Sequence, residues 1–114
     1  MNRGKIVLAK FPFTDLTSAK RRPASVLSSK ISNTNDVIVA FISSLIPVEL
    51  SETDLLFDRQ HQDFLISGLK SPSVIKLDKL ATLNTSVLSG EIGRVSATTL
   101  SDINKKLVIA LSID

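Results

Sequence analysis

The sequence predicts a small α+β domain that is mostly β-sheet, closed or half-closed into a barrel and completed by one C-terminal helix. Three observations predict this class. Short apolar runs rich in β-branched residues alternate with turn residues, residues 96–112 show helical spacing instead, and the 114 residues suffice for one domain, residues 1–114. A small sheet of this kind avoids exposed edges most simply by curling towards closure.

The first half of the chain contains three predicted strands. The third is apolar on both faces, as expected for a strand in the centre of a closed sheet. In chain order the elements are a strand over residues 6–11, a loop over 12–21, a strand over 24–28, a polar turn over 30–35 and a strand over 36–42.

The second half is less regular and ends in a helix. The predicted elements are a strand at 54–57, a loop over 58–68, a strand over 73–77, a turn over 85–88 capped by Asn84, and a last strand over 91–95. Ser96 is the expected N-cap of the helix, which runs to about residue 112 with apolar residues at helical spacing.

Charge is distributed unevenly along the chain. Residues 1–30 carry seven Lys/Arg and one Asp, whereas residues 31–114 carry seven Lys/Arg and ten Asp/Glu. A basic N-terminal part favours a polyanionic or acidic partner.

The chain has no cysteine, which excludes disulfides and thiolate chemistry. The first apolar run is too short for a signal peptide or membrane span, so we expect a cytoplasmic protein without membrane contact.

The most informative stretch is Lys20-Arg21-Arg22-Pro23, which leads directly into an apolar strand. Proline restricts the residue before it to extended geometry and is tolerated at the start of a strand. Arg22 would therefore be held at a strand mouth, where a guanidinium can bind a phosphate through two parallel hydrogen bonds. The alternative is a solvated basic loop.

Several segments in this order resemble the MazF/PemK family of toxin endoribonucleases from type II toxin–antitoxin systems. The resemblance covers nearly the whole chain, and the ordered set is more specific than any one motif. Its segments are residues 4–16, Arg22-Pro23 with the strand that follows, residues 36–43, residues 68–80, and residues 92–96 with the helix.

The resemblance implies an SH3-like barrel that forms a homodimer. It also implies sequence-specific cleavage of single-stranded RNA without a metal or other cofactor, and neutralisation by a cognate antitoxin whose extended tail fills the RNA groove. The catalytic arginine of the family corresponds to Arg22, and the hydroxyl that ends its third strand corresponds to Ser43. A basic residue and an aspartate used by some members correspond to Lys76 and Asp78.

Each of these residues also has a structural interpretation. Ser43 can satisfy a strand end, Asp78 can cap a turn or pair with Lys79, and Lys76 can be a surface cation. Asp78 is the candidate base, although a free aspartate is a weak base at neutral pH. Lys76 is a candidate RNA-binding residue that would neutralise a phosphate. Lys20 and Arg21 are expected to contact RNA phosphates rather than take part in the chemistry.

Departures from the family pattern concern the site more than the fold. Lys5 stands where many members have an acidic residue, serine replaces the usual threonine at Ser43, and the loop histidine of some members is missing. The only histidine, His61, can be an acid–base group or a surface residue.

RNA stacking would have to use phenylalanine, because the chain has no Tyr or Trp. Phe13, or its neighbour Phe11, is the candidate platform, and burial of both rings in the core is the alternative.

Two other functions remain open from the sequence alone. One is a toxin of the same fold that binds DNA gyrase, and the other is a barrel that binds RNA without cutting it.

Overall fold

Six strands pair into one antiparallel sheet in the computed structural model, which describes residues 2–10 and 21–114. The spatial order is β4-β5-β3-β2-β1-β6. The strands are β1 (Lys5–Ala9), β2 (Arg22–Val26), β3 (Asp36–Ser43), β4 (Asp54–Phe57), β5 (Ser73–Asn84) and β6 (Leu88–Arg94). Between and after them lie α1 (Phe64–Ser67), the 3₁₀-helix η1 (Thr85–Val87) and α2 (Ala97–Ala110). The predicted mostly-β class with a C-terminal helix is confirmed.

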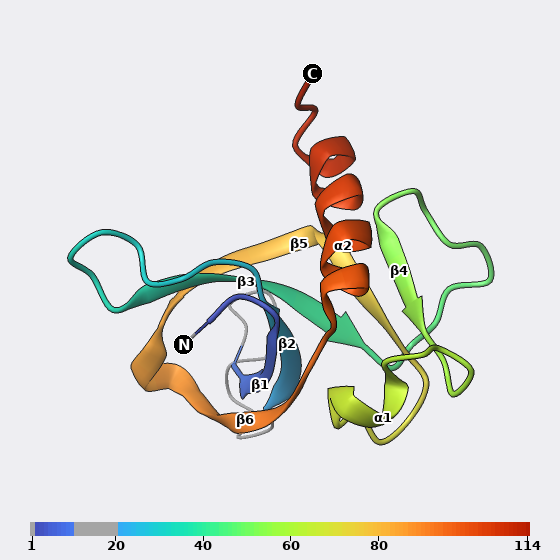
Figure 1. Ribbon diagram of the computed structural model, residues 1–114, viewed down its shortest axis with the longest axis horizontal. Coiled ribbons are helices and arrows are strands. Elements are labelled where there is room, and N and C mark those ends of the chain that lie inside the picture. Colours follow the sequence, from blue (N-terminus) through green and yellow to red (C-terminus); the bar gives the residue numbers. More distant parts are fainter. Residues whose placement is uncertain (1, 11–20) are drawn as a thin grey trace.

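The sheet is strongly curved, and β5, η1 and β6 sweep around β1 and β2 (Figure 1). Its two edges are β4 and β6. Within the described residues no ladder joins these two strands, so full closure into a barrel stays a prediction. α2 projects from the body and carries the C-terminus (Figure 1).

Apolar side chains fill both faces of the central strands, as the sequence predicted for residues 36–42. In β3, Val37 and Val39 belong to one core cluster, while Ala40 and Ile42 belong to the other. The second cluster also receives Phe57 from β4 and side chains from both helices. Both faces are covered because the sheet curls over one cluster and the helices cover the other.

Strand β5 is much longer than the predicted strand over 73–77. The prediction ended at the charged pair Asp78-Lys79, but this pair lies in an insertion within the strand. Ala40 of β3 pairs with Leu80, whereas the next residue, Phe41, pairs with Lys76. Residues 77–79 therefore bulge out of the ladder, which resumes beyond them.

Other parts of the predicted secondary structure were wrong as well. β2 begins at Arg22, two residues before the predicted strand over 24–28, and β6 begins at Leu88 rather than at residue 91. Gly90 makes the longer β6 possible, because it adopts φ +74° where the pairing with β1 shifts register. The predicted loop over 58–68 contains α1, a single turn too short to show helical periodicity.

α2 begins as predicted, since the Ser96 side chain accepts a hydrogen bond from the backbone N–H of Thr99. Across the described ranges, no helix is long and apolar enough to cross a membrane.

Candidate functional site

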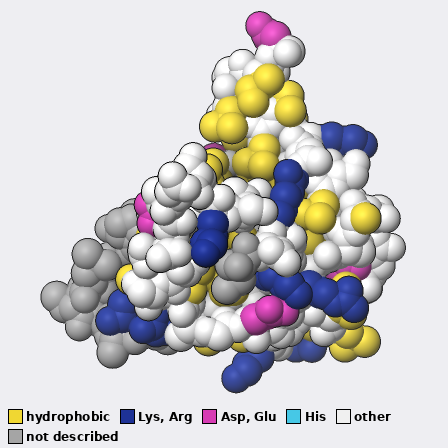
Figure 2. All heavy atoms as spheres, turned by 60° about the vertical axis from the view of Figure 1, so that its left-hand side comes forward, with side chains coloured by type: hydrophobic (Ala, Val, Ile, Leu, Met, Phe, Trp, Pro, Cys, Tyr) yellow, Lys and Arg dark blue, Asp and Glu magenta, His cyan; other side chains and the backbone are white. Residues whose placement is uncertain are grey.

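A hollow of about 830 Å³ opens where β2 begins and β3 ends. Arg22 and Pro23 come from β2, Phe41 and Ser43 come from β3, and the segment after α1 adds residues 68–71. Ends of several strands and one loop thus meet at a single depression. Figure 2 shows one face of the molecule, on which Lys and Arg side chains are scattered over the body below the projecting helix end.

Arg22 is the first residue of β2 and lines the hollow with an exposed side chain. Its backbone pairs with Ala9 of β1, and Pro23 pairs with Leu8. Pairing of β2 with β3 begins only at Ala24, so the missing amide of Pro23 breaks no ladder on that side. The backbone of Arg22 is therefore fixed while its guanidinium remains accessible to a ligand.

Arg21 also lines the hollow, but its guanidinium is partly engaged. Its Nη1 donates to the backbone carbonyl of Val87 at 2.7 Å. This bond connects the start of β2 to η1, which lies 66 residues further along the chain. A guanidinium has five N–H donors, so Arg21 retains donors for a phosphate.

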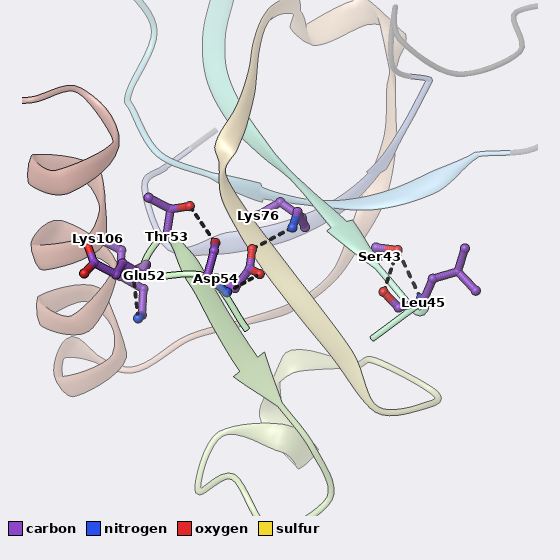
Figure 3. Close-up of polar contacts among 8 residues, drawn as sticks. Ser43, Leu45, Glu52, Thr53, Asp54, Lys76 and Lys106 are labelled. Carbon is purple, nitrogen blue, oxygen red and sulfur yellow. Dashed lines mark hydrogen bonds and ion pairs between the residues drawn. The ribbon is translucent and has the colours of Figure 1, made fainter. Parts of the chain in front are cut away.

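Ser43 ends β3, and its side chain lines the same hollow as Arg22. The hydroxyl oxygen accepts the backbone N–H of Leu45 at 3.0 Å, which closes a turn at the strand end (Figure 3). Its own contact to the Leu45 carbonyl is long, at 3.5 Å. The Ser43 proton can therefore turn towards a ligand while the oxygen keeps its turn bond.

Lys76 is an internal ion-pair partner rather than a free surface cation. Its Nζ lies 2.7 Å from Oδ1 of Asp54, and the two side chains are 19% and 1% exposed (Figure 3). Burial raises the pKa of Asp54, but hydrogen bonds from Lys76 and Ser51 and the Lys76 charge outweigh burial, and the pKa falls below its usual value. Lys76 lines a second hollow of about 310 Å³ next to the first.

The other predicted site residues lie apart from this arrangement or outside the described residues. Asp78 is exposed on the insertion in β5 and is not among the lining residues of either hollow. Lys20 and Phe13, like Phe11, fall in the range 11–20, outside the residues that the structure describes. Their roles therefore remain predictions.

His61 is half-buried and does not line either hollow. Its ring stacks on Phe57 with the centroids 4.0 Å apart, and its Nδ1 accepts the backbone N–H of Asp63. These contacts make it part of the packing around α1.

Three charged or aromatic lining residues were not identified as site residues from the sequence. Lys70 follows α1, Lys79 belongs to the insertion in β5, and the half-buried ring of Phe41 faces both hollows. Lys79 was considered only as a partner for Asp78, and Phe41 only as part of an apolar strand. For Lys70, the only local signal in the sequence was its position between Gly68 and Pro72.

The described lining of the large hollow is cationic. Arg21, Arg22, Lys70 and Lys79 contribute to it, and no Asp or Glu of the described chain does. The described residues also contain no group of three His, Asp or Glu side chains that could hold a metal ion. Four cations around a depression with a mostly apolar floor favour an extended polyanion that also carries flat apolar groups.

The rim at residues 68–70 is held in place by α1. Asp63, just before α1, is buried, and its Oδ2 accepts hydrogen bonds from Ser96 N and Oγ, both at 2.8 Å, and from Thr99 Oγ1 at 2.5 Å. The carboxylate therefore binds the N-terminus of α2. Burial raises the pKa of Asp63, but these hydrogen bonds outweigh burial and lower it below its usual value.

Two glycines allow α1 to approach β6 closely. A Cβ on Gly93 would lie 2.2 Å from the carbonyl carbon of Ser67, and one on Gly68 would lie 1.9 Å from the carbonyl oxygen of Ile92. Side chains at either position would push α1 and the following rim away from the sheet.

These features define a small antiparallel β-protein with a cationic hollow at its strand ends. The sequence profile of the PemK-like, MazF-like toxins of type II toxin–antitoxin systems matches residues 2–111. The chain belongs to this family. Comparison with curated protein sequences finds no match.

Solved structures share the fold at low sequence identity. An endoribonuclease from Mycobacterial species, solved in complex with its cognate antitoxin, is 18% identical with a TM-score of 0.76, over 100% of this chain and 97% of that one. The Mycobacterium tuberculosis toxin MazF-mt6 is 22% identical with a TM-score of 0.74, over 96% and 98%. A MazE–MazF structure from Deinococcus radiodurans is 23% identical with a TM-score of 0.71, over 100% and 98%.

Proposed function

We propose that this toxin is a metal-independent endoribonuclease that cuts single-stranded RNA at short sequences. The observation that carries the proposal is the cationic hollow in which Arg22 and Ser43 are both lining residues. Several of the similar structures are named endoribonucleases or MazF toxins, which is consistent with this activity. The family resemblance implies metal independence, and cleavage in EDTA would test it.

In the proposed reaction the ribose 2′-oxygen attacks the adjacent phosphorus atom. The 2′-hydroxyl loses its proton to a base, the bond from phosphorus to the 5′-oxygen breaks, and that oxygen takes up a proton. The products are a 2′,3′-cyclic phosphate and a 5′-hydroxyl. Negative charge grows on the phosphorane oxygens, where a donor that is already in position contributes most.

Arg22 is the proposed donor for that charge. Pairing with β1 fixes its backbone, and its accessible guanidinium can bind two phosphate oxygens at once. Ser43 would donate its proton to a non-bridging oxygen while its own oxygen keeps the turn bond to Leu45. Arg21 would contact a neighbouring phosphate, and Lys20 and Phe13 are proposed to bind the RNA from the loop before β2.

Proton transfer is the step for which the hollow offers fewest groups. No carboxylate of the described chain lines it, so charge stabilisation by cations carries most of the proposed rate enhancement. Asp78 remains the proposed base because it adjoins Lys79, which does line the hollow. We expect Asp78→Asn to lower the rate less than Arg22→Ala does.

We also propose a homodimer of single-domain chains with SH3-like barrels that acts in the cytoplasm and is neutralised by an antitoxin. The exposed apolar side chains at the end of α2 support self-association. Val108 and Ile109 in the last turn of α2, and Leu111 and Ile113 in the segment that follows it, are between 43% and 55% exposed. A cationic hollow would also attract an acidic antitoxin segment.

End-mapping of a long single-stranded RNA in EDTA tests the proposal. We expect cuts at one short sequence, and we expect Arg22→Ala to lower the rate by about 100-fold or more. Arg94→Ala is the matched control, because Arg94 is exposed at the end of β6 and lines neither hollow. Intact RNA with the wild-type protein, or full cutting by Arg22→Ala, would contradict the proposal.

A further inference from the structure

The smaller hollow differs from the large one in chemistry although the two adjoin. Both include Phe41, Ser43, Leu45 and Lys79 in their lining. Beyond these, the small hollow has the apolar residues Ile46 and Pro47 and the amine of Lys76. Ser43 thus lies at the boundary between the two hollows, which share Lys79, whereas Arg21, Arg22 and Lys70 line only the large one.

Lys76 in this recess is better suited to donating a directed hydrogen bond than to neutralising a phosphate. Its charge is balanced by Asp54, at 2.7 Å, so a phosphate would gain little from it. An ammonium group has three N–H donors, and this ion pair occupies one of them. The remaining donors are fixed in direction, because Asp54 is itself held by the backbone N–H of Ser51.

The recess also has the size and surface of a pocket for a single flat group. Its volume of about 310 Å³ lies at the lower end of the range for small-ligand pockets. The half-buried ring of Phe41 and the apolar side chains of Leu45 and Ile46 offer stacking and van der Waals surface. A nucleobase combines such a flat apolar face with carbonyl and ring-nitrogen acceptors at its edge.

We propose that the small hollow binds the nucleobase next to the phosphate held at Ser43, and that Lys76 donates a hydrogen bond to an acceptor on that base. Lys76 then sets sequence preference at one position, and Asp54 is a positioning residue that aims the amine. Figure 3 shows Lys76 and Asp54 reaching towards each other from the neighbouring strands β5 and β4. This inference rests on the proposed function, since it assumes an RNA strand in the large hollow.

The test compares wild type with the double variant Lys76→Met/Asp54→Asn. Met keeps an unbranched apolar stem, and Asn can still accept the Ser51 N–H, so no unpaired charge is left buried. Circular dichroism establishes that the variant is folded. End-mapping on a long RNA then measures base preference at each position around the cut, and we expect preference at one position to fall on the order of tenfold.

Binding is measured separately, so that the inference can be judged without cleavage. Fluorescence anisotropy of labelled 12-nucleotide poly-U, poly-C and poly-A strands, together with a mixed strand containing guanine, gives affinities at several salt concentrations. If Lys76 reads a base, the double variant loses the differences among strands and keeps the salt dependence. Lys70→Ala is the control, for which we expect weaker binding to every strand and a salt slope lower by about 0.7.

The outcomes separate the two proposals. A uniform loss of affinity with a lower salt slope in Lys76→Met/Asp54→Asn would make Lys76 a phosphate contact and overturn the inference. Unchanged preference in both assays would overturn it as well. If wild type binds RNA with base preference but never cuts, the proposed nuclease activity fails while the base subsite is still tested by the binding differences.

Discussion

Asp63→Asn is the most informative perturbation of the fold around the hollow. The carboxylate precedes α1 and accepts hydrogen bonds from Ser96 and Thr99 at the start of α2. It therefore ties the segment that leads to the hollow's rim to the C-terminal helix. Asn keeps the size and one acceptor oxygen but removes the charge.

The expected loss in the free energy of unfolding follows from the three hydrogen bonds that Asp63 accepts. Each bond to a charged acceptor is worth about 1 kcal/mol more than the same bond to a neutral one, which gives a loss of about 3 kcal/mol. Loss of the favourable charge at the N-terminus of α2 adds up to about 1 kcal/mol. For a domain of this size, 3 kcal/mol corresponds to a fall in Tm of roughly 12 °C.

The loss also depends on pH in a defined direction. Because the pKa of Asp63 in the folded protein lies below the ordinary value of 3.8, the carboxylate stabilises the fold above that value. This stabilisation disappears as the pH falls from 3.8 through the folded-state pKa. The difference between wild type and Asp63→Asn should be largest near neutral pH and shrink below pH 3.8.

Urea denaturation followed by far-UV circular dichroism measures this effect, since the chain has no Trp or Tyr to report by fluorescence. Asp102→Asn, at a half-buried position within α2, is the matched control. Equal losses of stability in the two variants at pH 7, or an Asp63→Asn deficit that stays constant down to pH 3, would contradict this role of Asp63.

Three further predictions address the rim, the site and the assembly. Gly93→Ala should lower the free energy of unfolding in urea by about 2–4 kcal/mol, because its Cβ would overlap a carbonyl of α1. Gly90→Ala, whose Cβ would have nothing within 4 Å, should lower it by about 1 kcal/mol through its positive φ alone. Equal losses would contradict the close approach of α1 to β6. Ser43→Ala should cut RNA on the order of 100-fold more slowly while Ser43→Thr keeps most of the rate, and equal rates for the two would remove the hydroxyl from the mechanism. Ile109→Glu should convert the proposed dimer to a monomer by light scattering while the exposed Ser101→Glu does not, and a monomeric wild type at micromolar concentration would reject the dimer.

The central sheet was predictable because its strands have strong local patterns. The doubly apolar β3 and the N-cap at Ser96 follow from short-range physical rules, and the structure confirms both. The full length of β5 was not predictable, because the insertion at 77–79 depends on pairing with β3 and on the hydrogen bond from Leu77 to Thr53. α1 was missed because a single turn held by Asp63 and close glycine contacts has no periodicity of its own.

The same distinction between local patterns and long-range contacts applies to the site. Arg22 could be singled out from sequence because proline acts on its immediate neighbour, and its place in the hollow depends on that local geometry. The pairing of Lys76 with Asp54 could not be foreseen, since it joins residues 22 positions apart through the register of β4 and β5. Lys70 likewise reaches the hollow only through the packing of α1 on β6.

The most direct test of the proposed chemistry uses one RNA oligonucleotide with the mapped cleavage site and a second that carries a single 2′-deoxyribose on the 5′ side of the scissile phosphate. Under single-turnover conditions in EDTA, the account predicts cutting of the first to a 2′,3′-cyclic phosphate and a 5′-hydroxyl, and no cutting of the second. Cleavage of the deoxy-substituted strand at the same position would show that the 2′-oxygen is not the nucleophile and would contradict the account.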